Sequence, residues 1–294
     1  MLYNKYRPDT YSQFLGNDEI VNSIQKHIKS ELCPQFYVFS GSHGVGKTTM
    51  ARLFGQSLGL EVEELNASNE NGVDFARKFV KDIHFQGFNN GVLYIIDEAH
   101  RLTKDAQNIL LKNLEEPPKN TYIIMCTTEI GSLLPTVLSR AVKYRFSNPE
   151  RRDLLNKLNF IVTQENIQTN EDVLKHIIRT SKGCPRDSIS LLENIVGVPV
   201  DKQIKAVESF LAEKSKTEQL CKSLLVKDWG SCAKVLQSNT DAPETIRREV
   251  MRYMARILLV GDSRAYIPLR EFHNINLADD KAGIILAACN VCMS

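Results

Sequence analysis

One glycine-rich stretch limits the fold of this 294-residue chain more than any other feature. A short apolar run at residues 36–39 leads into residues 41–48, which read GSHGVGKT, and a helical pattern follows. These eight residues fit the G-x-x-x-x-G-K-[ST] pattern of a phosphate-binding loop between a strand and a helix. Glycines let backbone N–H groups turn toward phosphate oxygens, and the following helix adds its positive dipole end. The stretch predicts a nucleotide phosphate site.

We call residues 41–48 the phosphate loop. Lys47 would reach the β- and γ-phosphates of the nucleotide, and the Thr48 hydroxyl would bind Mg²⁺. A glycine-rich turn without a ligand is the alternative, and the strand–loop–helix context favours the phosphate site. The predicted nucleotide-binding residues of this stretch are Gly41, Ser42, His43, Gly44, Val45, Gly46, Lys47, Thr48 and Thr49.

Composition narrows the class of protein. The chain is 43% hydrophobic and 24% charged, which is ordinary for a globular chain of about two domains. Its formal net charge is only +2, so any nucleic-acid surface must be a local group of basic side chains. Seven scattered cysteines favour reduced thiols. We found neither a signal peptide nor a membrane-spanning run, and we therefore expect a cytoplasmic protein with no membrane contact.

Strands and helices alternate in the first half of the chain. Apolar runs at residues 92–96 and 122–126 are typical of central parallel strands, which are covered on both faces. The alternation predicts an α/β fold with a doubly wound parallel sheet, whose ligands bind at the carboxyl ends of the strands. The second half shows only helical periodicity. The expected division is an α/β domain at 1–149 and two helical regions, at 150–198 and 199–294, which we call the lid and the collar.

Two acidic residues, Asp97 and Glu98, follow the apolar run at residues 92–96. An acid at the end of a central strand can hold the hydration shell of Mg²⁺, and a second acid can activate an attacking water. The pair is therefore interpreted as Walker B, with Asp97 on the metal side and Glu98 as the base. Residues 97–100 also spell the DEAH of one helicase superfamily, but the helical remainder leaves no room for a second α/β domain.

The sequence resembles the ATPase subunits of sliding-clamp loaders, a group of AAA+ ATPases that contains bacterial DnaX and the small subunits of replication factor C. The resemblance covers residues 1 to about 195, and the last part of the chain matches only in being helical. It rests on the phosphate loop, DEAH at 97–100, KYRP at 5–8 with Phe14 and Gly16, LLKNLEEPP at 110–118, Thr127-Thr128, Leu138-Ser139-Arg140 and PRDS at 185–188.

The resemblance implies ATP as the nucleotide and adds site residues. Thr128 would be sensor 1, which touches the attacking water or the γ-phosphate, and Arg186 would be sensor 2, from the helical lid. Arg140 would be an arginine finger that reaches the nucleotide of a neighbouring subunit. Either arginine could instead be a salt-bridged surface residue. The adenine pocket would be lined by Tyr6, Arg7 and Pro8.

A finger that acts on a neighbour requires an oligomer, which in this family is a pentameric ring. The implied function is a DNA-dependent ATPase that opens a sliding clamp and places it on primer–template DNA during replication. The implied partners are the clamp, this DNA and other loader subunits. Another AAA+ DNA motor, such as a branch-migration helicase or an initiator, and a non-enzymatic scaffold subunit of the loader are the alternatives.

The chain also departs from the family pattern. Ala141 follows Arg140 where the family has cysteine, which makes the finger motif less specific. No cysteine lies between Cys33 and Cys126, so the zinc module of DnaX proteins is expected to be absent. Without the long DnaX tail, the chain looks like a pared-down loader of bacterial or viral origin.

Basic side chains gather on two neighbouring predicted helices. In clamp loaders the corresponding helices point their N-terminal ends at DNA phosphates, whereas charge alone favours a solvated helix face. Phe85 and Phe88 could touch the clamp or belong to the core. The DNA-binding residues that the resemblance implies, called here the basic surface, are Arg77, Lys81, Arg101, Thr103 and Lys104.

Two features near the C-terminus are expected to be structural. Cys289 and Cys292 form a C-x-x-C pair, but no matching His or Cys pair lies nearby to complete a zinc site. A basic stripe on a predicted helix at 243–260 would be a solvated face or a subunit interface. Its residues are Arg248, Arg252 and Arg256.

Overall fold

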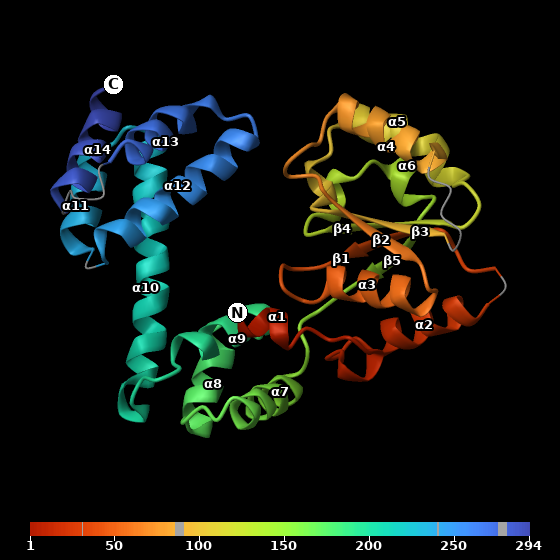
Figure 1. Cartoon of the computed structure of the whole chain (residues 1–294), viewed down its shortest axis with the longest axis horizontal. Helices are drawn as coiled ribbons and strands as arrows, with labels where there is room; N and C mark the ends of the chain where they lie inside the picture. The colour runs from red at the N-terminus through yellow and green to blue at the C-terminus, as the bar shows by residue number, and fades with distance from the viewer. Residues whose placement is uncertain (31, 86–90, 240, 276–280) are drawn as a thin grey trace. The chain divides into compact units, whose positions relative to one another are not determined.

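The computed structural model describes residues 1–30, 32–85, 91–239, 241–275 and 281–294 (Figure 1). The chain divides into two compact units, Met1–Gln203 and Ile204–Ser294. The first unit holds a parallel β-sheet with helices, and the described part of the second is helical. The predicted fold class, an α/β region followed by an all-α region, is therefore confirmed. The finer boundaries near residues 149 and 198 stay predictions.

Five parallel strands form the sheet, in the order β2-β3-β4-β1-β5. Because β4 lies between β3 and β1 and all three strands are parallel, the carboxyl ends of β3, β4 and β1 are neighbours. In parallel sheets this edge is where ligands bind. The strands are β1 (Phe36–Ser40), β2 (Glu61–Asn66), β3 (Val92–Asp97), β4 (Thr121–Thr127) and β5 (Val142–Arg145).

Helices cover both faces of the sheet, because alternate side chains of each strand point to opposite sides. In β3, Leu93 and Ile95 pack with α2 and α3, whereas Tyr94 and Ile96 pack with α4, α5 and α6. This double coverage explains why the central strands read as continuous apolar runs. The helices are α2 (Asp18–Lys29), α3 (Lys47–Ser57), α4 (Val73–Phe85), α5 (Lys104–Glu115) and α6 (Pro135–Leu138).

Three further helices complete the first unit, as the sequence predicted for residues 150–198. Asn170 caps the second of them, since its Oδ1 accepts the backbone N–H of Val173 at 3.0 Å. The third begins with Pro185, whose missing N–H costs nothing in the first turn. The short N-terminal helix packs against this third helix. The N-terminal helix is α1 (Leu2–Lys5), and the three further helices are α7 (Arg151–Gln164), α8 (Glu171–Thr180) and α9 (Pro185–Asn194).

The second unit has its own core, in which Val250, Met254 and Phe272 are fully buried. Cys292 Sγ lies 3.8 Å from Cys232 Sγ, and Cys289 Sγ lies 3.7 Å from Met293 Sδ, so the two thiols of the C-x-x-C pair have different neighbours. The helices are α10 (Val200–Leu225), whose first four residues belong to the first unit, α11 (Trp229–Ser238), α12 (Pro243–Leu259), α13 (Tyr266–His273) and α14 (Lys281–Met293).

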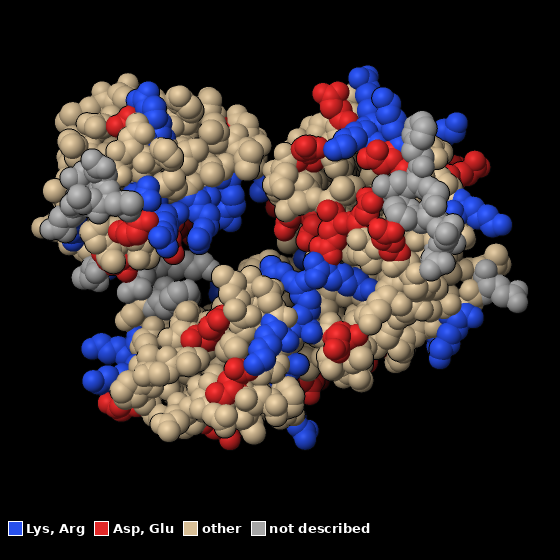
Figure 2. All heavy atoms as spheres, viewed as in Figure 1, with Lys and Arg blue, Asp and Glu red and all other residues tan. Residues whose placement is uncertain are grey.

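The basic stripe on α12 is exposed at Arg248, Arg252 and Arg256, and Figure 2 shows Lys and Arg side chains gathered over this helix.

Among the described residues, no helix combines the length and apolar character that a membrane crossing needs. Short 3-10 helices complete the described secondary structure at Tyr11–Gln13 (η1), Ala99–Arg101 (η2), Ile130–Ser132 (η3) and Ser263–Ala265 (η4).

Candidate nucleotide site

The phosphate loop joins β1 to α3 at the carboxyl edge of the sheet. Gly44 and Gly46 have φ angles of 71° and 101°, in the left-handed region that favours glycine. A Cβ atom on Gly44 would lie 2.5 Å from Cys184 Sγ, and one on Gly46 would lie 2.7 Å from the Phe14 ring. The loop therefore passes tightly between the N-terminal arm and the start of α9. A close-fitting glycine cradle at a helix N-terminus suits a phosphate group.

Lys47 is buried beneath this loop. Its Nζ donates hydrogen bonds to the carbonyl oxygens of Gly41 and Ser42, both at 2.8 Å. Burial lowers the pKa of the ammonium group, and the nearby carboxylates of Asp97 and Glu98 partly oppose that shift. A buried cation whose bonding partners are neutral carbonyls would gain from an incoming anion.

The two residues predicted to hold Mg²⁺ lie together. The Thr48 hydroxyl donates to Asp97 Oδ2 at 2.9 Å, and Asp97 Oδ1 accepts the backbone N–H of Glu98 at 3.0 Å. Because β1 and β3 are separated only by β4, the start of α3 and the end of β3 meet at one edge. Hydroxyl and carboxylate oxygens are ligands that Mg²⁺ prefers, so the residues fit this ion.

His100, to which sequence reasoning gave no role, connects Glu98 to the next strand. Its side chain is only 8% exposed, with Nε2 3.4 Å from Glu98 Oε2 and Nδ1 3.4 Å from the Thr127 hydroxyl. An ionised carboxylate only accepts hydrogen bonds, so the tautomer with its proton on Nε2 suits both neighbours. Glu98 itself has φ 54°, a conformation that costs a non-glycine residue about 1–3 kcal/mol. His100 thus lies where it can orient the Glu98 carboxylate.

The sensor 1 region follows β4, between the phosphate loop and Asp97. The carbonyl oxygen of Thr127 accepts the Gly41 N–H at 3.2 Å, which ties β4 to the loop. Thr127 is buried, and its hydroxyl also accepts the backbone N–H of Glu129 at 3.0 Å. Thr128, the predicted sensor, is exposed at the same edge.

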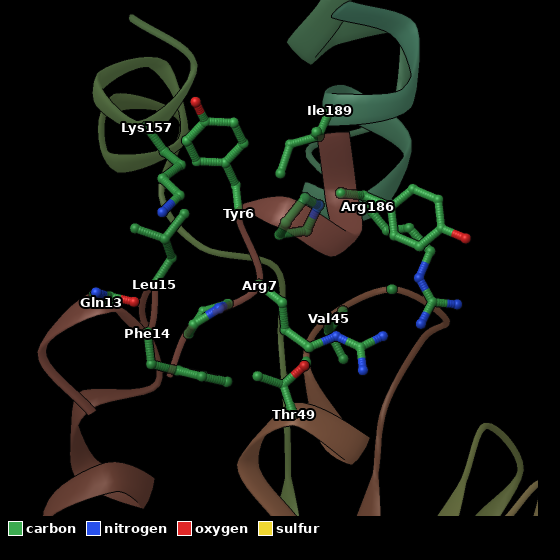
Figure 3. Close-up of a pocket in the computed structure, with 15 residues that line it drawn as sticks. Tyr6, Arg7, Gln13, Phe14, Leu15, Val45, Thr49, Lys157, Arg186 and Ile189 are labelled. Carbon is green, nitrogen blue, oxygen red and sulfur yellow. The ribbon is translucent and has the colours of Figure 1, made fainter. Parts of the chain in front are cut away.

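A pocket beside the phosphate loop brings together four separate segments, which are the N-terminal arm, the loop with the start of α3, α7 and α9 (Figure 3). Tyr6, Arg7 and Pro8 come from the N-terminal arm and Arg186 comes from α9. The first three are the residues implied for the adenine base. The other lining residues are Tyr3, Gln13, Phe14, Leu15, Gly44, Val45, Gly46, Thr49, Lys157, Pro185 and Ile189.

The pocket is positively charged. In Figure 3 the guanidinium of Arg7 points toward Thr49, and Arg186 extends alongside the loop. Burial lowers the pKa of Arg7, and the charges of Arg52 and Arg186 lower it further. Arg186 also lies over the Tyr3 ring, with its central guanidinium carbon 5.9 Å from the ring centroid. Converging cations of this kind suit a polyphosphate.

Arg140 lies apart from this pocket. Its Nε and Nη2 donate to Glu115 Oε2 at 2.9 and 2.7 Å, and its Nη1 donates to the Thr136 carbonyl oxygen at 2.8 Å. The structure therefore does not place Arg140 in the site of its own chain. Its predicted role in a neighbouring site stays a prediction.

The basic surface lies on α4 and on the segment that leads into α5. The carbonyl oxygen of Asn71 accepts the Thr103 N–H at 3.0 Å, which joins the starts of the two helices. Thr103 caps α5, because its hydroxyl accepts the Ala106 N–H at 3.1 Å. All five predicted DNA-binding side chains are exposed. Phe88 and the side chain of Phe85 lie outside the described residues.

Comparison with known proteins identifies relatives. A sequence model of the family described as DNA polymerase III, delta subunit, matches residues 61–150. The DNA polymerase III subunit gamma/tau of Mycoplasma genitalium is 31% identical over 220 residues, which are 66% of this chain and 37% of that protein. The DNA polymerase III subunit tau of Bacillus subtilis is 30% identical over 77% of this chain and 44% of that protein. The chain thus spans well under half the length of these relatives.

Among solved structures, the RuvB Holliday junction branch migration motor of Thermotoga maritima matches with a TM-score of 0.59. It is 15% identical, and the match covers 83% of this chain and 85% of that one, so it speaks for the fold alone. The relatives named here are bacterial and give no support to a viral origin. Together with the strand order and the phosphate loop, these similarities show that the chain belongs to the DNA polymerase III gamma/tau (DnaX) clamp-loader family and has an AAA+ fold.

Proposed function

We propose that this chain is an ATPase subunit of a sliding-clamp loader, which uses ATP binding and hydrolysis to place a clamp on primer–template DNA. The observation that carries the proposal is the 2.9 Å hydrogen bond from Thr48 to Asp97. It joins the phosphate loop to the acidic end of β3 and puts the proposed metal ligands beside the buried Lys47. These contacts are our reason for proposing this activity for a chain that spans less than half the length of its relatives.

Binding would divide among several segments of the pocket. The phosphate loop and Lys47 would hold the β- and γ-phosphates, and Tyr6, Arg7 and Pro8 would enclose the adenine. Thr48 and Asp97 would hold Mg²⁺, which neutralises phosphate charge when bound. Arg186 would bring α9 onto the same nucleotide, so that the lid responds to whether ATP is present.

Proton transfer falls to Glu98. A carboxylate at the end of β3 can accept a proton from a water molecule that attacks the γ-phosphate. His100 would orient this carboxylate through Nε2, and Thr127 would in turn hold the imidazole. Thr128 would touch the attacking water or the γ-phosphate from the end of β4.

Hydrolysis would be completed by a second subunit. Arg140 bonds to Glu115 in its own chain and lies apart from that chain's pocket. As the family resemblance implies, in a ring its guanidinium would face the nucleotide of the adjacent subunit. Such a cation stabilises charge in a loose phosphoryl-transfer transition state. We infer a ring, with other loader subunits, in which each site needs two chains.

DNA would act on the ring through the basic surface. The joined starts of α4 and α5 present two positive helix ends, and four exposed basic side chains lie along α4 and near the start of α5. Such an arrangement suits backbone phosphates without base readout. Arg77→Glu with Lys81→Glu should therefore abolish the stimulation of ATPase by DNA while basal ATPase survives. The matched control reverses two other exposed charges of this unit, Lys112→Glu with Lys119→Glu. An unchanged DNA response in the first pair would remove this surface from the proposal.

The central test is Glu98→Gln in the assembled loader. The variant should bind a fluorescent ATP analogue like the wild type but lose DNA-stimulated turnover by about 10²-fold or more, since it lacks the proposed base. Glu116→Gln removes an exposed carboxylate elsewhere in the unit and should leave turnover intact. Full turnover in Glu98→Gln would contradict the proposed enzyme. Failure of the wild-type protein to bind ATP would favour a scaffold subunit.

A further inference from the structure

Three metal-binding side chains meet on the outer side of the phosphate loop. One ligand atom from each of His43, Cys184 and Asp187 lies within 4.8 Å of the other two. His43 Nε2 is 3.0 Å from Asp187 Oδ2, and the Cys184 thiol is 3.4 Å from the His43 carbonyl oxygen. His43 belongs to the loop, whereas Cys184 and Asp187 belong to the start of α9. The cluster therefore bridges two segments that are far apart in sequence.

The types of ligand favour one class of metal. A thiolate, an imidazole and a carboxylate are together typical of Zn²⁺, which is four-coordinate and accepts water as a fourth ligand. Mg²⁺ and Ca²⁺ prefer oxygen ligands only and would gain little from Cys184. Distances of up to 4.8 Å between ligand atoms need only small side-chain rotations to reach metal–ligand bonds of about 2.0–2.3 Å.

The thiol of Cys184 is enclosed at the start of α9, where it is 5% exposed. Burial raises the pKa of this thiol and the Asp187 carboxylate raises it too, whereas the backbone N–H groups of Asp187 and Arg186 oppose the shift. An arriving metal ion therefore has to displace a proton. His43 and Asp187 are more exposed, and they provide the access from solvent.

We propose that His43, Cys184 and Asp187 form a Zn²⁺ site that fastens α9 to the phosphate loop. None of the three residues is a ligand of the Mg²⁺ proposed above, so the two sites are distinct. Pro185 and Arg186, which lie between two of the ligands, line the nucleotide pocket. Bound Zn²⁺ would therefore hold the pocket closed and slow the exchange of nucleotide. This last consequence rests on the proposed function, whereas metal binding does not.

Direct titration of the full-length, tag-free and reduced protein tests the site. With a chromophoric chelator as competitor, the wild type should bind one Zn²⁺ per chain at this site, and Co²⁺ should give the near-ultraviolet band of a cobalt–thiolate bond. Cys184→Ser and Asp187→Asn should each weaken Zn²⁺ binding by at least tenfold, and Cys184→Ser should abolish the band. Cys33→Ser, at a half-buried cysteine elsewhere in the unit, is the matched control and should change neither result.

Equal Zn²⁺ affinity in the wild type and Cys184→Ser would overturn the site, as would loss of the band in Cys33→Ser. Circular dichroism of each variant establishes that it is folded, and Asp187→Asn provides an independent test because it leaves all the thiols in place. Zn²⁺ should also slow the release of a fluorescent ATP analogue from the wild type but not from Cys184→Ser. Zn²⁺ binding at Cys184 with unchanged release would refute the closing effect, whereas failure to bind nucleotide without Zn²⁺ would refute the proposed function.

Discussion

The carboxyl edge of the sheet and the region around Arg140 are two parts of one proposed active site, and they differ in how complete they are. At the sheet edge, Thr48 bonds to Asp97 and His100 lies against Glu98. Around Arg140, the guanidinium bonds to Glu115 and to a backbone carbonyl, and to no residue of the sheet edge. In one chain, therefore, the candidate binding residues lie together, whereas the Arg140 guanidinium lies apart from them. This difference is what a site shared between subunits requires.

Removing the Arg140 guanidinium should have the largest effect on catalysis. Arg140→Ala should lower DNA-stimulated turnover by about 10³-fold, because an arginine finger stabilises transition-state charge, while ATP binding stays as in the wild type. Steady-state ATPase of the assembled loader and equilibrium binding of an ATP analogue measure the two quantities. Lys143→Ala, which removes another exposed cation of the same region, is the control.

Retained turnover in Arg140→Ala would break the comparison, since Arg140 would then be a surface residue paired with Glu115. Mixing Arg140→Ala subunits with Glu98→Gln subunits sharpens the test. A shared site predicts that some interfaces of the mixed ring combine an intact Arg140 with an intact Glu98, so part of the turnover returns. Mixtures that stay inactive would argue against catalysis across the interface.

The next largest effect is expected at Lys47, within the sheet edge. Lys47→Met should weaken ATP binding by roughly 10²-fold or more, because a buried charged donor aimed at the phosphates is lost. Burial lowers the pKa of Lys47, so its charge is stabilised less in the folded protein than in water. The neutral methionine should therefore keep or raise the melting temperature. A variant that unfolds would show that the carbonyl contacts of Lys47 hold the loop together.

His100 should have a smaller effect, because it acts through Glu98. His100→Ala should lower turnover by about tenfold to 10²-fold with little change in ATP binding, as general-base positioning is worth part of the base's own contribution. His273→Ala, in the second unit, is the control. A change in KM without a change in kcat would assign His100 to binding instead of positioning.

The smallest effect is expected from removing helix caps. It compares the loss of stability at the cap of α5, in the basic surface, with the loss at the cap of α8. Thr103→Ala and Asn170→Ala should each reduce the free energy of unfolding by about 1 kcal/mol, because each removes one N-cap hydrogen bond. Urea unfolding followed by circular dichroism measures both. Thr103→Ser is compared with Thr103→Ala in both stability and the stimulation of ATPase by DNA. If Thr103 acts through its helix, the serine variant should restore both quantities together. Restored stability without restored stimulation would instead indicate a contact of the Thr103 side chain with DNA.

Much of the candidate site's geometry was predictable because its signals are local. The phosphate loop is continuous in sequence, and Asp97 and Glu98 follow a strand recognisable by its apolar run. The phosphate loop and the acidic pair are expected to meet, because parallel strands all end at the same edge of a sheet. The role of His100 escapes sequence reasoning, because its partner Thr127 is 27 residues away and lies on another strand. In the sequence, His100 stands out only as the last letter of DEAH.

The sequence by itself determined how strands and helices follow one another along the chain, the phosphate loop and the position of the acidic pair. These features depend on periodicity and glycine placement, which act over a few residues. Only the tertiary structure decided which distant groups touch: Arg140 with Glu115, His100 with Thr127, and Cys184 with the loop at His43 and Gly44. The physical reason is that such contacts depend on the order of the strands within the sheet and on helix packing. These bring together side chains that no local pattern connects.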